Sequence, residues 1–223
     1  MINSKITDQI FAALHARDTE KARRIVRDNH GVLEARDTSG ISILQMALYM
    51  RAEPFVAMLL EEGAVPDLWA AAALGDAGHL AAAIRANDGK VSGHSADGWT
   101  ALHLAAHFGN TESCRLLLFA GADVSAWSTN SLRNQPLHAA IAGGSDDVVA
   151  LILEAGADAN AAQHGGFAPL HGAAEHGAGV QVTSLLARGA DPRRLTDDGQ
   201  SAVDIAERAG HVELAERLRQ LIS

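Results

Sequence analysis

DGWTALHLAAHFGNTESCRLLLFAGAD, residues 97–123, decides the fold because much of it recurs further along the chain. Its Leu-His pair is found at 102–103, 137–138 and 170–171, in steps of 35 and then 33 residues. In each of these three copies, Gly-Ala-Asp follows the leucine after 19 residues. A fourth copy begins at Asp198, and its Val203 continues the series after another 33 residues. Self-similarity at this period predicts a repeat architecture.

Each copy predicts two short helices joined by a glycine turn. In residues 97–123 the first helix should start near Leu102 and present small side chains on one side. Gly109 should end it, because glycine tolerates a positive φ at a helix C-terminus. The second helix carries apolar residues such as Cys114 and Leu117 at the spacing of one face. Helices this short are marginal alone, so they should stack on their neighbours as a solenoid.

This pattern resembles the ankyrin repeat. The family motif Asp-x-x-Gly-x-Thr-Pro-Leu-His-x-Ala-Ala, then a glycine, a Val-x-x-Leu-Leu helix and Gly-Ala-Asp, is matched closely at 97–123 and 166–191. The resemblance implies an all-α solenoid of about seven helix-turn-helix pairs with short β-hairpin or loop fingers. These pairs are expected near residues 4–35, 36–65, 66–96, 97–130, 131–163, 164–196 and 197–223.

We expect a single ankyrin-repeat domain over residues 1–223. It divides into an N-terminal cap (1–35), degenerate repeats (36–96), regular repeats (97–196) and a C-terminal cap (197–223). In the degenerate stretch SGISILQMALYMRAEPFVAMLLEEGA (39–64), Gln45 stands where the histidine is expected. The last pair carries charges on an otherwise apolar face, as a terminal repeat needs for solubility.

Two histidines of the deciding stretch, His103 and His107, are four positions apart, which is the spacing of a metal site or an acid–base pair on one helix face. His103, however, belongs to a recurring series that includes His138 and His171. In the resembled family this histidine is a scaffold residue that forms hydrogen bonds within and between turns. His107 does not recur, so it is free for recognition or merely exposed; the matching positions hold Ala142, Glu175 and Arg208.

No stretch carries a catalytic motif. HLAAH lacks the glutamate of a zinc-protease helix, and GGSDDVV (143–149) lacks the lysine and the spacing of a phosphate-binding loop. There is no Gly-x-Ser-x-Gly nucleophile turn. Cys114 stands where the motif wants a buried valine, so it is expected to be a small core residue. We therefore expect no enzyme, no cofactor and no metal.

Charge and hydropathy limit the classes of partner. The net charge of −9 disfavours binding to a phosphate backbone, and the basic stretches 21–27 and 193–194 contain no aromatic residues. No apolar run approaches the 18 residues of a membrane span, and the N-terminus has no pattern of a secretory signal. A single cysteine cannot form an internal disulfide. We expect a cytoplasmic monomer that binds neither nucleic acid nor membrane.

The resemblance implies that a protein partner binds a concave surface built from the finger loops and the first helix of each repeat. Clustered exposed aromatic residues mark interaction sites, and Trp99, Phe108 and Trp127 lie in or just after one repeat. Alternatively, Trp99 and Phe108 pack on each other and stiffen a hairpin. The candidate partner-binding residues are Tyr49, Met50, Trp99, His107, Phe108, Trp127, Asn134, Phe167, Glu175, His176 and Arg208, with Ala142 and Gln200 on the same variable surface.

Two further expectations depend on local departures from the repeat. The stretch VSAWSTNSLRNQPLH is two residues longer than its counterpart and has Arg133 in place of the usual glycine, so the finger at 124–135 should differ in shape. It either contacts a ligand or is a tolerated insertion. A second class of function is a carrier of a small ligand, haem or metal that uses surface histidines. His164, His171 and His176, with Glu175 beside them, form a loose cluster that could serve it.

Overall fold

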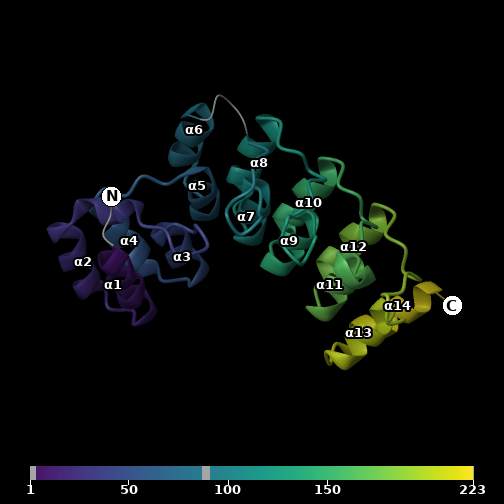
Figure 1. Cartoon of the computed structure of the whole chain (residues 1–223). Helices are drawn as coiled ribbons and strands as arrows, with labels where there is room; N and C mark the ends of the chain where they lie inside the picture. Colours follow the sequence, from purple (N-terminus) through teal and green to yellow (C-terminus); the bar gives the residue numbers. More distant parts are fainter. Residues whose placement is uncertain (1–3, 87–90, 223) are drawn as a thin grey trace.

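The computed structural model describes residues 4–86 and 91–222, and over these residues the chain is an arch of stacked helix pairs (Figure 1). Residues 87–90, within the expected pair 66–96, lie outside the described part. The predicted all-α solenoid of seven pairs is confirmed. The pairs are α1 (Ser4–His15) with α2 (Thr19–Asp28), α3 (Ile43–Tyr49) with α4 (Glu53–Glu61), α5 (Leu68–Leu74) with α6 (Ala77–Ala86), α7 (Ala101–His107) with α8 (Thr111–Phe119), α9 (Pro136–Gly143) with α10 (Asp146–Glu154), α11 (Pro169–Glu175) with α12 (Gly179–Ala187), and α13 (Ala202–Arg208) with α14 (Val212–Ile222).

The first helix of a repeat begins where a polar or proline residue suits a helix N-terminus. The side chains of Ser42, Asp67 and Thr100 accept hydrogen bonds from backbone N–H groups in the first turns of α3, α5 and α7. Such caps satisfy donors that have no partner inside the helix. Pro136 and Pro169 open α9 and α11, where a missing N–H costs nothing.

The first helices of the repeats line the inside of the arch, and the second helices form its outside (Figure 1). The inner helices can lie close together because their contacts are made by fully buried small residues such as Ala105, Ala140 and Ala173. Cys114 of α8 is also fully buried in this core, as expected, and burial raises the pKa of its thiol to about 12. In the described part of the chain, no helix is long and apolar enough to cross a membrane.

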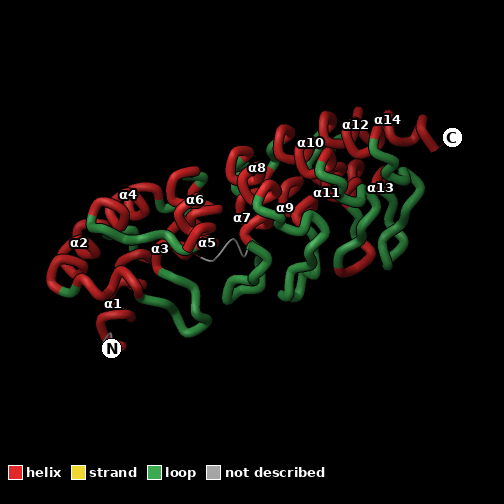
Figure 2. Tube along the Cα trace, turned by 90° about the horizontal axis from the view of Figure 1, so that it is seen from above, coloured by secondary structure: helices red, strands yellow, loops and turns green. Residues whose placement is uncertain are grey.

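Loops project from the inner edge of the stack as fingers (Figure 2). Within the described residues they contain no strand and only isolated antiparallel bridges, such as His94 with Thr100. In that finger the Ser95 N–H donates to the carbonyl of Trp99, four residues later. In the finger at 124–135, the Ser128 N–H donates to the carbonyl of Asn134, six residues later. The longer closure gives this finger the different shape that the sequence predicted.

Side chains of one repeat also cap helices of the preceding repeat. The Asn110 amide donates to the carbonyls of Ala72 and Ala73 at 3.0 and 2.8 Å, near the end of α5. His211 Nε2 donates in the same way to the carbonyl of Glu175 at 3.1 Å, at the end of α11. These bonds satisfy carbonyls that would otherwise lack an intrahelical partner, and they fix the register between repeats.

Gly143 tests how closely the inner helices approach each other. A Cβ at this position would lie 2.2 Å from the backbone carbonyl oxygen of His107. Alanine inside a helix normally stabilises by about 1 kcal/mol relative to glycine. We predict the opposite sign for Gly143→Ala, a loss of about 1–3 kcal/mol through overpacking, measured by urea unfolding.

The matched control is Gly144→Ala. Gly144 has φ +78° and no atom within 4 Å of an added Cβ, so its substitution costs only the backbone strain of about 1–2 kcal/mol. The helix contact would be contradicted if Gly143→Ala left stability unchanged or raised it.

Candidate partner-binding groove

Two adjoining hollows lie on the inner face of the stack, between the fingers and the C-terminal ends of the inner helices. The first, about 380 Å³, is lined by Tyr49, Arg51, Asp97, Trp99, His103, Leu104, His107, Phe108, Leu132, Asn134, Ala139 and Ala142. The second, about 170 Å³, is lined by Leu132, Asn134, His138, Ile141, Ala142, Gln163, Phe167, Ala168, Pro169, Gly172, Glu175 and His176. The two hollows share Leu132, Asn134 and Ala142, and together we call them the inner groove.

Most of the sequence-predicted candidates meet in this groove: Tyr49, Trp99, His107, Phe108, Asn134, Phe167, Glu175 and His176. Met50, Trp127 and Arg208 line neither hollow. Trp127 is 42% exposed in its finger, where its carbonyl accepts a bond from His94 Nε2 at 2.9 Å. Arg208 donates to the side-chain oxygen of Gln200 at 2.7 Å. The binding role of all these residues stays a prediction.

The aromatic rings of the groove are held by neighbours that the repeat supplies. Trp99 closes its finger through bonds with Ser95, and its ring centroid lies 5.6 Å from that of His103. Phe108 stacks on Tyr49 with ring centroids 6.3 Å apart, and it meets His107 edge to face at 5.4 Å. Trp99 and Phe108 therefore each rest on a different partner. Both are half-buried, so part of each ring remains accessible.

Asn134 holds an unpaired polar atom at the point where the two hollows meet. The residue is 6% exposed, and its Oδ1 is buried without a hydrogen-bond partner among the described residues. Its backbone is fully used, because the N–H donates to Ser128 Oγ and the carbonyl accepts from His103 Nε2. A buried acceptor without a partner is unfavourable. The oxygen is covered by surrounding protein atoms, so in this conformation a ligand does not reach it.

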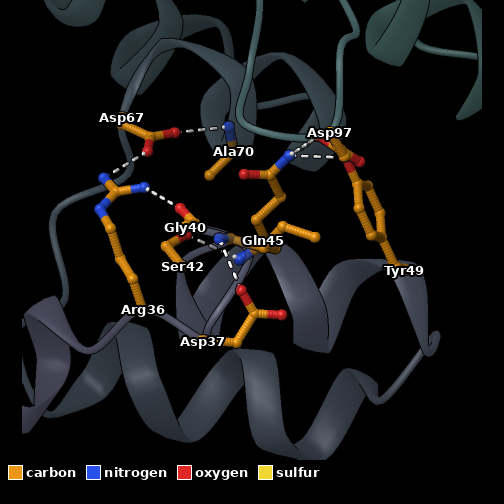
Figure 3. A network of polar contacts seen from close by, with 10 residues as sticks. Arg36, Asp37, Gly40, Ser42, Gln45, Tyr49, Asp67, Ala70 and Asp97 are labelled. Atoms are coloured by element: carbon orange, nitrogen blue, oxygen red, sulfur yellow. Dashed lines mark hydrogen bonds and ion pairs between the residues drawn. The ribbon is translucent and has the colours of Figure 1, made fainter. Parts of the chain in front are cut away.

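A polar network holds the other end of the groove (Figure 3). Gln45 takes the histidine position of its repeat, and its Nε2 donates to the Tyr49 hydroxyl at 2.5 Å and to Asp97 Oδ1 at 3.4 Å. Ser95 Oγ donates to the same Asp97 oxygen at 2.7 Å. Burial, and then the nearby Asp97 carboxylate, raise the pKa of Tyr49 far above its ordinary value. The phenol therefore stays neutral at physiological pH.

The network in Figure 3 continues into the next repeat and fixes the orientation of the degenerate half. Arg36 donates to the carbonyl of Gly40 at 2.9 Å and pairs with Asp67 at 3.1 Å. The other carboxylate oxygen of Asp67 caps α5 through the N–H of Ala70. The third pair follows its predecessor without a long finger, and this ion pair ties the two together.

The scaffold histidines lie beneath the groove and remain neutral. The Nε2 of His103 must carry the proton, because it donates at 3.0 Å to the carbonyl of Asn134; its Nδ1 then accepts from the Thr100 hydroxyl at 2.7 Å. His171 bridges in the same manner from the N–H of Ala168 to the carbonyl of Arg194. The bonding role that the family resemblance implied for this histidine is present at both positions.

Burial sets the charge state of the groove. Burial lowers the pKa of His103 to about 4, and it lowers the pKa of His107 together with the positive charge of Arg51. With both imidazoles neutral at pH 7, Arg51 and Asp97 are the charged residues that line the first hollow. Sequence reasoning missed both, because Asp97 was assigned to the repeat frame and Arg51 follows the end of α3.

The described residues contain no group of three or more His, Cys, Asp or Glu side chains arranged to hold a metal ion. One further surface feature was missed from the sequence. Phe119, at the end of α8, is 95% exposed on the outside of the arch, beside the half-buried Leu116, Leu118 and Leu151.

Comparison with known proteins supports the repeat assignment. Residues 68–163 match the family model described as ankyrin repeats in three copies. The chain is 35% identical over 123 residues to tyrosine-protein kinase Shark of Drosophila melanogaster, which covers 55% of this chain and 13% of that protein. It is 39% identical over 95 residues to the mouse B-cell lymphoma 3 protein homolog (43% and 21%) and 33% identical over 119 residues to zebrafish neurogenic locus notch homolog protein 1 (53% and 5%). The alignments therefore span only a small part of these longer relatives.

The buried histidines predict how stability depends on pH. The pKa values of His103 and His138 are lowered to about 4 in the folded chain, whereas an unfolded histidine titrates near pH 6.5. The free energy of unfolding should therefore be unaffected by these histidines above about pH 6.5. It should fall as the pH drops toward 4, because the unfolded chain binds protons that the two buried imidazoles of the folded chain do not. Each of the two histidines should lower the free energy of unfolding at pH 4 by about 3 kcal/mol relative to its value above pH 6.5.

Urea unfolding across this pH range tests the effect in wild type and in His103→Gln. Glutamine can donate to the Asn134 carbonyl but does not titrate, so the variant should lose less stability between pH 7 and pH 4. If both proteins lost the same free energy of unfolding between pH 7 and pH 4, His103 would not be a source of the pH dependence.

Proposed function

Since residues 68–163 of this chain are ankyrin repeats, we propose that the chain is a protein–protein interaction module that binds an extended segment of a partner in the inner groove. Ankyrin repeats are in general protein–protein interaction modules without enzymatic activity. The aligned segments are small parts of much longer relatives, so the activities of those whole proteins are not evidence for the function of this chain.

The observation that carries this proposal is the composition of the groove. Aromatic rings that are only half-buried surround the first hollow, and the second hollow adjoins it along the inner helices. Such rings supply a large apolar contact area to a ligand. An extended protein segment can place successive side chains in the two adjoining hollows, which a compact inorganic ligand cannot do.

A histidine-based carrier has less support. His103 and His171 use both ring nitrogens within the scaffold, so neither lone pair is available to a metal. His107 and His176 both keep solvent-accessible surface, but they lie in different hollows. We also propose that the chain acts as a cytoplasmic monomer without enzymatic activity, and that it binds neither nucleic acid nor membrane.

Ala142→Trp tests the proposal by filling the groove without removing a contact. Ala142 is exposed and lines both hollows, so a tryptophan there should block a ligand and leave the fold intact. The control is Ala82→Trp, at an exposed position of the outer helix α6 that lines neither hollow. Circular dichroism should give the same helicity for all three proteins.

The measurement is a pull-down from cell lysate, identified by mass spectrometry. We expect proteins that wild type and Ala82→Trp both capture and that Ala142→Trp loses. Capture of the same proteins by all three would contradict a ligand site in the inner groove.

A further inference from the structure

The first hollow combines features that attract a cation. Three of the chain's nine aromatic residues, Tyr49, Trp99 and Phe108, line this one space of about 380 Å³. All three are half-buried, so each ring keeps accessible surface. The face of an aromatic ring carries negative potential and attracts a Lys or Arg side chain at close range.

Asp97 adds a carboxylate to the same lining. Ser95 and Gln45 both donate to its Oδ1, and the Tyr49 side chain is also hydrogen-bonded to this carboxylate. Figure 3 shows the contact with Gln45. These bonds fix the carboxylate before a ligand arrives. A carboxylate held in this way can accept a charge-assisted hydrogen bond from an ammonium or guanidinium group.

The charges around the hollow also favour a basic partner. The whole chain has a net charge of −9, which raises the rate of encounter with a positively charged segment. Glu175 adds an exposed carboxylate in the second hollow. His103 and His107 have lowered pKa values, so neither adds a positive charge at neutral pH.

Arg51 is the one opposing charge in the lining of the first hollow. It is exposed, and it also lines a neighbouring apolar hollow beside α4, so it stands at the edge between the two. Arg51 should repel a cation bound in the first hollow, so removal of its charge should strengthen binding.

We propose that the partner segment places a lysine or arginine side chain in the first hollow, against the rings of Tyr49, Trp99 and Phe108 and beside the Asp97 carboxylate. The partner is thus a basic, extended stretch of protein. This inference rests on the proposed function, because it names the chemistry of the ligand in the same groove.

The test begins with a random peptide display library selected on the full chain, with Ala142→Trp as the counter-selection. We expect groove-dependent peptides that share one Lys or Arg at a fixed position. Affinities of selected peptides are then measured for wild type, Asp97→Asn and Arg51→Ala. Asp97→Asn should weaken binding by about tenfold, and Arg51→Ala should strengthen it.

The matched control is Asp198→Asn. Asp198 occupies the equivalent finger position and accepts from Thr196 Oγ1 as Asp97 accepts from Ser95, but it lines neither hollow. It should leave affinity unchanged. Replacing the peptide's Lys or Arg with glutamine should weaken its binding to wild type. The same replacement should cause little further loss of affinity for Asp97→Asn, because the two changes remove the same interaction.

The outcomes separate this inference from the proposed function. The selected peptides could be neutral or acidic, or could bind Asp97→Asn as well as wild type. Either result would overturn the placement of a Lys or Arg side chain in the first hollow and would leave the groove as a protein-binding site. The absence of any groove-dependent peptide would overturn both. Tetramethylammonium and Nα-acetyl-arginine amide serve as free cations: if either bound as tightly as the peptides, the extended segment would be overturned.

Discussion

The close approach of neighbouring inner helices is the constraint on which the rest of this structure depends. Fully buried alanines make the contacts, and Gly143 leaves no room for a Cβ beside the backbone of His107. Helices of this length gain most of their stability from such stacking. Because the C-terminal ends of these helices come together with the fingers, their side chains form one lining. The groove is thus a consequence of the packing of the repeats.

The recurring histidine joins the scaffold to the groove. His103 donates to the carbonyl of Asn134 in the next finger, and this bond helps to hold the Asn134 side chain between the two hollows. Where Gln45 replaces the histidine, it instead holds Tyr49 and Asp97, which both line the first hollow. A position that serves the fold in regular repeats therefore shapes the ligand surface in the degenerate one.

The sequence was sufficient for the repeat frame because Leu-His and Gly-Ala-Asp recur at a fixed period. It also gave most of the residues that meet in the groove, since variable positions at the ends of the inner helices fall on one side of a regular stack. It could not give the burial of Asn134, which depends on how a finger two residues longer closes on Ser128. Asp97 and Arg51 were also missed, because a residue of the repeat frame and a residue after the end of α3 join one lining only when the repeats pack together.

Binding of an extended segment in the inner groove can be followed at the three tryptophan indoles in one nuclear magnetic resonance spectrum. Trp99 lines the groove, whereas Trp69 donates its indole N–H to the carbonyl of Gly93 and Trp127 lies in the neighbouring finger outside the groove. On addition of a captured partner segment to the labelled chain, the indole resonance of Trp99 should shift most. A shift confined to Trp127 or Trp69, or saturable binding with no shift at Trp99, would show that the segment binds outside the inner groove.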